Sequence, residues 1–373
     1  MSFLRRQESD EFSTNFNEIP AFAGMTGMKK KILIAPLNWG LGHTARCIPI
    51  IKALLKHDFE PILASDGDAL ALLQKEFPLL KSYQLPSYNI KYSKGSAQKL
   101  KLFLNSPTIL KASISEQKEV RKIHKKENLS GIISDNRFGV RLTAIPSVYI
   151  THQINVLSGK TTAITSNLHQ KIIAKFDQCW VPDFKDAILS GKLSSFENKK
   201  LNIKYIGAIS RLEQQTLPIK YDLLIVLSGP EPQRTLLEEK LIAELKTSTK
   251  KTLLVRGVFS NTIVAEINKY TTVVNYMLTE QLQQAFNESK VVLARSGYST
   301  ILDLAKLEKK AFFIPTPGQY EQKYLAERMK DLGIAPFTTQ KDFKLNMLTS
   351  VDAYHGFINS SDTTLNVNLF ELF

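Results

Sequence analysis

One turn in the C-terminal part of the chain combines small and polar residues in an order that could hold a phosphate. It reads Ala-Arg-Ser-Gly-Tyr-Ser-Thr over residues 294–300, between an apolar run and an apolar helical segment. The pattern predicts a buried strand that turns at Gly297 into a helix. The first turn of a helix offers unpaired N–H groups and a partial positive charge, which suit an anion. We therefore expect a diphosphate here, with donor contacts from Ser296, Gly297, Tyr298, Ser299 and Thr300.

Acidic and amide side chains follow this turn at positions that suit sugar hydroxyls. Asp303 lies one turn into the predicted helix, where it can accept hydrogen bonds from a ribose. The next predicted strand, 311–314, ends in a polar loop, and Glu321 and Gln322 at the end of that loop can reach a second sugar. Phosphate, ribose and donor sugar would then meet in one crevice. The alternative is a solvated helix turn and loop.

A second glycine-containing turn lies near the other end of the chain, where residues 40–43 read Gly-Leu-Gly-His. The glycines allow a sharp passage from strand to helix and leave room for a ligand. The helix dipole disfavours a charged His43, so we expect a neutral ring that can take a proton from a hydroxyl nucleophile. Asp135, after the predicted strand 129–134, can hold that ring. The alternatives are a histidine that packs locally and an aspartate that caps a turn.

Four residues of the same half are predicted to lie on the acceptor side. His152 and Asn155 follow the predicted strand 147–150 and suit a polyhydroxylated acceptor, although His152 could instead make a structural hydrogen bond. Arg46, one turn after His43, could meet an anionic acceptor or could be a surface cation. Gly42 completes this set, because its backbone would approach the acceptor closely.

The first turn of the second half is a further candidate for donor contacts. Ser228 and Gly229 follow the predicted strand 222–227. Their backbone N–H groups, together with Arg234, could face a diphosphate.

Two more donor candidates lie outside these turns. Arg211 stands at the predicted cleft mouth, where it could neutralise a leaving nucleotide or bridge the domains. Met277 follows a strand, so its backbone could read a base edge or its side chain could simply pack.

A metal site is not evident in the sequence. The Asp-Gly-Asp at 66–68 reads as a turn, and no His or Cys pair has zinc spacing. We predict neither a metal nor a cofactor.

Short apolar runs alternate with helical segments along the chain, as expected of βαβ units and mostly parallel sheets. Strands are predicted at 32–35, 61–64, 129–134, 147–150, 175–181 and 204–207. The pattern then restarts, with strands at 222–227, 252–255, 272–274, 290–293 and 311–314. We predict an α/β fold of two Rossmann-like domains facing a cleft: an acceptor-binding domain at 28–210, a nucleotide-sugar-binding domain at 211–350 and a C-terminal tail at 351–373. Every motif above lies where a predicted strand ends, which is where such sheets bind ligands.

The net charge of +14 requires an explanation. It could reflect a lysine-rich surface, or attraction to anionic lipids or substrates. Nucleic acid is the weakest reading, because no RNA- or DNA-binding motif accompanies the charge. The segment 91–126 mixes lysines with apolar residues, which predicts either a solvated basic helix or a patch that contacts anionic membranes. Cys47 and Cys179 are far apart and are expected to be small buried hydrophobes.

Residues 1–27 differ from the rest of the chain. They carry several charged residues and lack an apolar segment of signal-peptide length. We interpret them as a start-site artefact or a disordered leader.

Together these motifs resemble glycosyltransferases of the GT-B fold, and most closely family 28, which includes the enzyme that adds N-acetylglucosamine to lipid-linked peptidoglycan precursor. The resemblance covers about residues 28–340. It rests on the turn 40–43, on His-Gln-Ile-Asn at 152–155 with Ser-Gly at 158–159, on Gly-Ala-Ile-Ser-Arg at 207–211, on Ser-Gly at 228–229 and on Arg-Ser-Gly-Tyr-Ser-Thr at 295–300. The chain has Gln153 where the family's His-Glu-Gln-Asn segment has an acid, Asp303 where the donor motif has Glu, and Ser-Gly-Pro-Glu-Pro at 228–232 in place of Gly-Gly-Ser-Gln-Gly. Glu321 and Gln322 fall where the family contacts the donor sugar.

The resemblance implies a nucleotide-activated donor, UDP-linked, and inversion at the anomeric carbon without an essential metal. It implies that His43 deprotonates the acceptor hydroxyl and that Asp135 orients it. The acceptor could be a lipid-linked or cell-surface glycan precursor, a glycolipid or a small metabolite, handled in the cytoplasm with or without contact with the inner face of the membrane. A nucleotide-sugar hydrolase on the same fold and a non-enzymatic sugar-nucleotide-binding protein are the alternatives.

Overall fold

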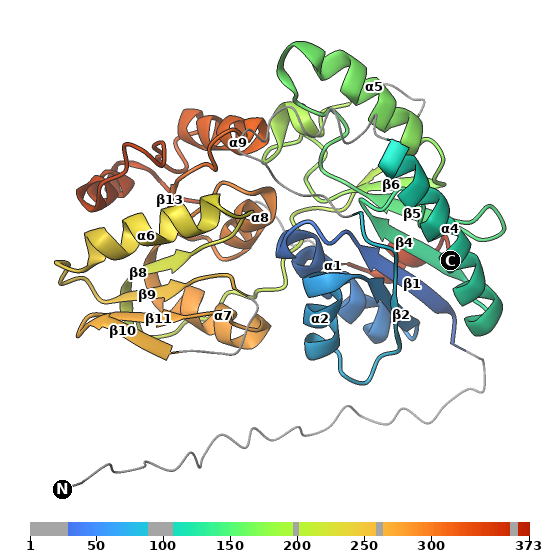
Figure 1. Ribbon diagram of the computed structural model, residues 1–373, viewed down its shortest axis with the longest axis horizontal. Coiled ribbons are helices and arrows are strands. Elements are labelled where there is room, and N and C mark those ends of the chain that lie inside the picture. The colour runs from blue at the N-terminus through green and yellow to red at the C-terminus, as the bar shows by residue number, and fades with distance from the viewer. Residues whose placement is uncertain (1–28, 89–106, 197–200, 259–263, 359–364) are drawn as a thin grey trace, which may run out of the picture.

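The computed structural model describes residues 29–88, 107–196, 201–258, 264–358 and 365–373. The predicted leader and the first part of the basic segment 91–126 lie outside these residues. The described chain forms two α/β lobes that lie side by side (Figure 1). The predicted fold class, two Rossmann-like domains, is therefore confirmed.

The N-terminal lobe is built on a sheet whose described strands all run parallel, in the order β3-β2-β1-β4-β5-β6-β7. Its strands are β1 Lys31–Pro36, β2 Glu60–Ser65, β3 Ser82–Gln84, β4 Gly131–Asp135, β5 Ser147–Ile150, β6 Gln178–Val181 and β7 Ile203–Tyr205. Its helices are α1 Leu41–Lys56, α2 Gly67–Glu76, α4 Pro107–Glu127 and α5 Thr162–Ile173.

The C-terminal lobe has the sheet order β10-β11-β9-β8-β12-β13, in which only the β10–β11 pair of the described strands is antiparallel. Its strands are β8 Tyr221–Val226, β9 Thr252–Val255, β10 Val264–Asn268, β11 Thr271–Val274, β12 Ser289–Ala294 and β13 Lys310–Phe313. Its helices are α6 Gln233–Leu245, α7 Thr279–Asn287, α8 Tyr298–Lys306 and α9 Tyr320–Asp331.

Burial explains why the central strands could be predicted. Ile32, Leu33 and Ile34 of β1 are all fully buried, as expected of a parallel strand covered by helices on both faces. The sequence analysis missed the short edge strands β3 and β10 and the helix α7. It also predicted a loop up to residue 322, whereas α9 begins at Tyr320 and places Glu321 in its first turn.

The C-terminal segment, predicted as a tail, returns to the N-terminal lobe and packs into its core (Figure 1). Phe370 and Phe373 both lie edge-on to Trp180 of β6. Gly131 makes this possible, because a Cβ at that position would lie 2.1 Å from the Phe373 ring. Lys30 donates a hydrogen bond to the Phe373 carbonyl. The end of the chain thus ties one lobe to the other.

Candidate functional site

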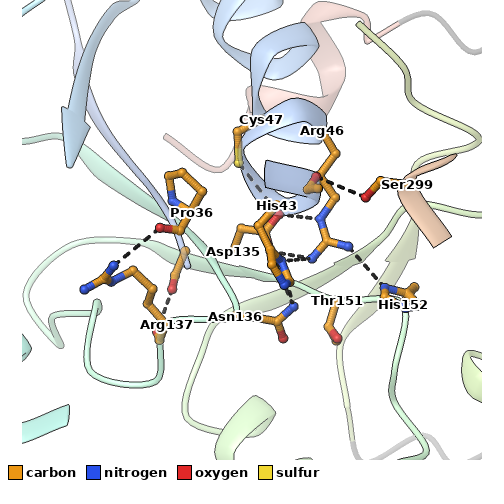
Figure 2. Close-up of polar contacts among 12 residues, drawn as sticks. Pro36, His43, Arg46, Cys47, Asp135, Asn136, Arg137, Thr151, His152 and Ser299 are labelled. Carbon is orange, nitrogen blue, oxygen red and sulfur yellow. Dashed lines mark hydrogen bonds and ion pairs between the residues drawn. The ribbon is translucent and has the colours of Figure 1, made fainter. Parts of the chain in front are cut away.

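The candidate site lies where the carboxyl ends of the two sheets approach each other. In the N-terminal lobe, the ends of β1 and β4 face the start of α1. In the C-terminal lobe, β12 ends at the start of α8. The two helix starts are in contact, because the Ser299 hydroxyl donates to the Gly42 carbonyl at 3.0 Å (Figure 2). Both predicted helix turns therefore border a single interface.

His43 and Asp135 meet as the sequence predicted. The His43 Nδ1 atom lies 2.7 Å from Asp135 Oδ1. Asp135 is the last residue of β4 and is 0% exposed, whereas His43 in the first turn of α1 is partly exposed. Nδ1 also lies 2.8 Å from Arg46 Nη2, which can only donate, so that contact makes no hydrogen bond when Nδ1 is protonated. We assign the proton to Nδ1 because the nearer Asp135 carboxylate only accepts, and the lone pair then lies on Nε2. That tautomer leaves Nε2 able to accept a proton from a ligand.

Arg46 does not have either predicted role, as an acceptor contact or a surface cation. Its side chain is 2% exposed, and its Nε and Nη2 atoms donate to the two Asp135 oxygens (Figure 2). Burial alone would raise the pKa of Asp135, but Arg46 and His43 outweigh it and lower that pKa to about 2. Asp135 is therefore a carboxylate at neutral pH. The sequence signal was the i,i+3 spacing of His43 and Arg46, which places both on one face of a helix.

His152 is also different from the prediction, because both ring nitrogens are engaged inside the protein. Nε2 lies 2.7 Å from Glu321 Oε1, and Nδ1 lies 3.1 Å from Arg46 Nη1. The ring stacks on Tyr298 with centroids 4.2 Å apart. Burial lowers the pKa of His152, which favours a neutral ring. The side chain is 6% exposed and is not free to bind an acceptor.

Asn155 is likewise not available as predicted. Its amide nitrogen donates to the carbonyls of Lys192 and Ser195 at 2.9 Å each, so it holds the 191–195 turn in place. Gln153, which the resemblance singled out, instead donates to Glu321 across the lobes.

The donor-side turn at 228–229 is open in this structure. Ser228 and Gly229 are exposed, and Gly229 has φ of 101°, a conformation that strongly favours glycine. An added Cβ at Gly297 would meet nothing within 4 Å, so space also surrounds the start of α8. Thr300 is partly exposed beside it. These positions remain predictions for the donor site.

The sequence analysis missed Thr316, which follows β13. Its hydroxyl is buried and has no hydrogen-bond partner among the described residues. It lies 3.5 Å from the position that a Cβ of Gly229 would occupy. Since β8, β12 and β13 are neighbours in the sheet, this hydroxyl, the 228–229 turn and the start of α8 belong to one end of it. Its sequence signal was the polar Thr between two prolines, directly after a buried strand.

Three predicted donor contacts make hydrogen bonds within the C-terminal lobe. The Ser296 hydroxyl donates to the Gln322 carbonyl, and the Gln322 Oε1 atom accepts from the Thr316 N–H. Arg234 is buried and donates to Glu231 and Glu238 rather than facing an open diphosphate site. The physical reason is the same in each case, because a buried polar group is stabilised by a fixed partner.

Tyr298 and Ser299 bind the other lobe rather than an open site. The Tyr298 hydroxyl donates to the Pro182 carbonyl at 2.8 Å, and its ring lies against His152. Ser299 is bonded to Gly42, which was predicted on the acceptor side. Both residues therefore belong to the interface between the lobes.

The remaining donor candidates lie around the linker. Asp303 accepts a hydrogen bond from Ser210, and burial raises the pKa of its carboxyl to about 6. Arg211 lies between Glu76 of the N-terminal lobe and Thr279 of the C-terminal lobe, which supports the bridging alternative. The Met277 side chain packs against the core of the C-terminal lobe, which is the second of the two roles considered for this residue.

Two general features bear on the chemistry. In the parts of the chain that the structure describes, no three His, Cys, Asp or Glu side chains are grouped so that they could hold a metal ion. None of the described helices is both long and apolar enough to cross a membrane. Asp66, the first acid of the Asp-Gly-Asp turn, is paired with buried Arg137 at 2.6 Å.

Comparisons with known proteins find glycosyltransferases. The glycosyltransferase family 28 C-terminal domain matches residues 232–352. The chain is 22% identical over 338 residues to the UDP-N-acetylglucosamine--N-acetylmuramyl-(pentapeptide) pyrophosphoryl-undecaprenol N-acetylglucosamine transferase of Haemophilus influenzae strain PittEE, across 87% of this chain and 89% of that protein.

Solved structures share the fold at lower identity. The glycotransferase of kitacinnamycin superposes with a TM-score of 0.62 at 14% identity, covering 87% of this chain and 90% of the other. MurG of Acinetobacter baumannii superposes with a TM-score of 0.50 at 16% identity, covering 88% and 91%. At such identities the likeness establishes the fold alone.

Proposed function

Because this chain is a GT-B-fold glycosyltransferase that carries a family 28 C-terminal domain, we propose that it moves a sugar from a UDP-linked donor to a hydroxyl acceptor with inversion. One observation carries the proposal. His43, with its Nδ1 atom on Asp135, lies beside the contact between α1 and α8, and Gly297 immediately precedes α8. A base and an anion-binding helix start thus border the same interface from opposite lobes.

The donor diphosphate would bind at the carboxyl ends of β8, β12 and β13. The exposed turn 228–229 and the start of α8 can present backbone N–H groups to phosphate oxygens. The unpartnered hydroxyl of Thr316 can donate to the same ligand. Backbone donors and a helix dipole stabilise a leaving diphosphate without an essential metal.

In the proposed reaction, His43 Nε2 removes the proton from the acceptor hydroxyl. The acceptor oxygen attacks the anomeric carbon from the face opposite the nucleotide, and the bond from that carbon to the phosphate oxygen breaks. UDP leaves with its negative charge held near the start of α8. Asp135 stays ionised, because its pKa is lowered to about 2, and so stabilises the imidazolium that forms.

Glu321 can still contact a donor sugar, although both its oxygens are engaged. One accepts from His152 and the other from Gln153. Each carboxylate oxygen has a second lone pair, so a sugar hydroxyl can add to either one. Asp303 is proposed as a ribose contact in the same way, in addition to its bond with Ser210.

The acceptor is proposed to be a lipid-linked or cell-surface glycan precursor, reached at an anionic membrane surface. The support is the outer face of α4. Leu110 and Ile114 are 65% and 61% exposed there, beside exposed cations at Lys111, Lys118 and Lys125. Apolar side chains among lysines favour anionic headgroups.

The test begins with a thermal-shift panel of sugar nucleotides, followed by assay of UDP release with the stabilising donor. His43→Ala should lower turnover by about 10²–10⁴-fold, since that is the usual contribution of a general base. The variant should still be stabilised by the donor. Unchanged turnover in His43→Ala would contradict the base role. UDP release that no acceptor accelerates would instead identify a nucleotide-sugar hydrolase.

A further inference from the structure

The contacts of the His43–Asp135 pair continue beyond the carboxylate. Arg46 donates to both Asp135 oxygens and also approaches His152 Nδ1 at 3.1 Å (Figure 2). Every one of these residues belongs to the N-terminal lobe. A guanidinium has several donors in a fixed plane, so its orientation on Asp135 and its orientation on His152 cannot be set independently.

The outer end of this network is held by the other lobe. Glu321, in the first turn of α9, accepts a hydrogen bond from His152 Nε2 at 2.7 Å. Tyr298, the first residue of α8, stacks on the His152 ring at an interplanar angle of 11°. His152 is therefore fixed at its edge and on its face by two residues of the C-terminal lobe.

One assignment of protons satisfies the contacts with the two carboxylates and the contact between Arg46 and His152, and leaves the 2.8 Å approach of Arg46 Nη2 to His43 Nδ1 without a hydrogen bond. Arg46 offers only donors, so His152 Nδ1 must accept, and its Nε2–H then donates to the Glu321 carboxylate. Asp135 accepts from Arg46 and from the Nδ1–H of His43. Burial favours the neutral His152 that this assignment requires, because it lowers the pKa of the ring.

We propose that Arg46 and His152 are positioning residues through which closure of the two lobes orients the His43 base. The inference rests on the proposed role of His43. When Tyr298 and Glu321 are in place, His152 holds Arg46, and Arg46 holds the Asp135 carboxylate that aligns the His43 ring. When the lobes separate, His152 loses both partners, and the base loses its alignment. Deprotonation of the acceptor is thereby coupled to closure over the donor.

The first test needs no substrate, because ¹⁵N NMR of the histidine rings reports tautomers directly. In the full chain we expect His43 as the Nδ1–H form and His152 as the Nε2–H form. His152→Phe keeps an aromatic ring against Tyr298 but removes both hydrogen bonds, so the His43 ring signals should shift. Tyr298→Leu, a change in the other lobe, should shift them as well.

Matched controls separate positioning from general disturbance. Tyr298→Phe keeps the stacked ring and loses only the contacts of the hydroxyl, which are with Pro182, Asp183 and Ser190 and not with His152, so it should leave the His43 signals in place. His152→Gln, which can both accept and donate, should restore part of the wild-type pattern. If the His43 signals are the same in wild type, His152→Phe and Tyr298→Leu, the proposal is overturned.

The second test is kinetic and uses UDP-N-acetylglucosamine as the donor probe. Arg46→Lys keeps the charge but not the fork, so kcat should fall by about 10- to 100-fold, as a small misplacement of a catalytic group does. The KM for the donor should change by no more than about threefold, because Arg46 is not among the proposed donor contacts. An unchanged kcat would overturn the proposal. No turnover by the wild type with any sugar nucleotide would refute the proposed function instead, and the NMR result would still decide the positioning roles.

Discussion

The two sides of the site use different parts of the polypeptide. On the N-terminal side, charged and aromatic side chains are bonded to one another, from His43 through Asp135 and Arg46 to His152. On the C-terminal side, the open positions are an exposed turn at 228–229 and a helix start, with one hydroxyl that has no described partner. The difference teaches that a base needs its direction fixed before it can take the proton of the acceptor. A phosphate site needs donors that are still unpaired.

The largest effect is expected from breaking the hydrogen-bonded network on the N-terminal side of the site. Asp135→Asn removes the charge that Arg46 faces and leaves one acceptor oxygen where Arg46 and His43 use two, so the His43 tautomer is no longer fixed. Leaving a buried arginine without its partner should cost about 3–5 kcal/mol in the free energy of unfolding. UDP release should fall by about 10²–10⁴-fold. Chemical denaturation and steady-state assays check both, and a variant of wild-type stability would show that the network is not coupled.

The outer surfaces of the two lobes provide the next contrast. Replacing Lys111, Lys118 and Lys125 of α4 by Gln should weaken sedimentation with phosphatidylserine vesicles by about 10- to 100-fold at low salt, since each surface cation contributes about 1 kcal/mol. Lys250→Gln and Lys269→Gln, exposed in the C-terminal lobe, serve as the control and should have little effect. Equal losses from both sets would indicate a general charge effect instead of a docking face.

The next prediction concerns Asp303, a proposed donor contact whose buried carboxylate should lower the stability of the folded protein at neutral pH. Burial raises the pKa of the Asp303 carboxyl from 3.8 to about 6 in the folded protein. The carboxyl therefore contributes most to folding stability below pH 3.8, and this contribution is lost as the pH rises through about 6. Asp303→Asn should therefore be more stable than wild type at pH 8, by about 1–3 kcal/mol.

The same variant should bind UDP more weakly, by about 1–3 kcal/mol in calorimetry, because a buried charged partner of the ligand is lost. Higher stability with unchanged affinity would remove Asp303 from the donor site and leave it as a hydrogen-bond partner of Ser210 in the linker.

The smallest effect is expected at the unpaired hydroxyl. Thr316→Val should weaken UDP binding by about 0.5–1.5 kcal/mol, the usual net value of one hydrogen bond. Its own thermal stability should hardly change, because the hydroxyl has no described partner to lose. Thr271→Val is the matched control, since that hydroxyl in β11 is also buried and unpartnered. Equal UDP affinity in the two variants would argue against a donor role for Thr316.

The sequence was most informative where local pattern and tertiary structure depend on the same residues. The apolar runs of β1, β8 and β12 predicted buried parallel strands, and their restart predicted two lobes, which the structure and the related folds confirm. Glycine-containing turns after strands predicted where the helix starts would lie, and Asp135 was predicted to hold His43. Edge elements such as β3 and β10 are short and half-buried, so their sequences carry little pattern.

The sequence by itself determined which strands are buried, where the two glycine-containing turns lie and which types of polar residue surround them. These features follow from hydrophobic periodicity and from the positions of glycine. Only the tertiary structure decided which polar side chains form hydrogen bonds with one another and are therefore not available to a ligand. Arg46, His152 and Arg234 look available in the sequence but are buried against specific partners. The physical reason is that the bonds of Arg46 to Asp135 and of His152 to Glu321 join residues 89 and 169 positions apart, which no local pattern records. Arg234 has its partner Glu238 one helical turn away, but only the packing of α6 shows that the pair is buried.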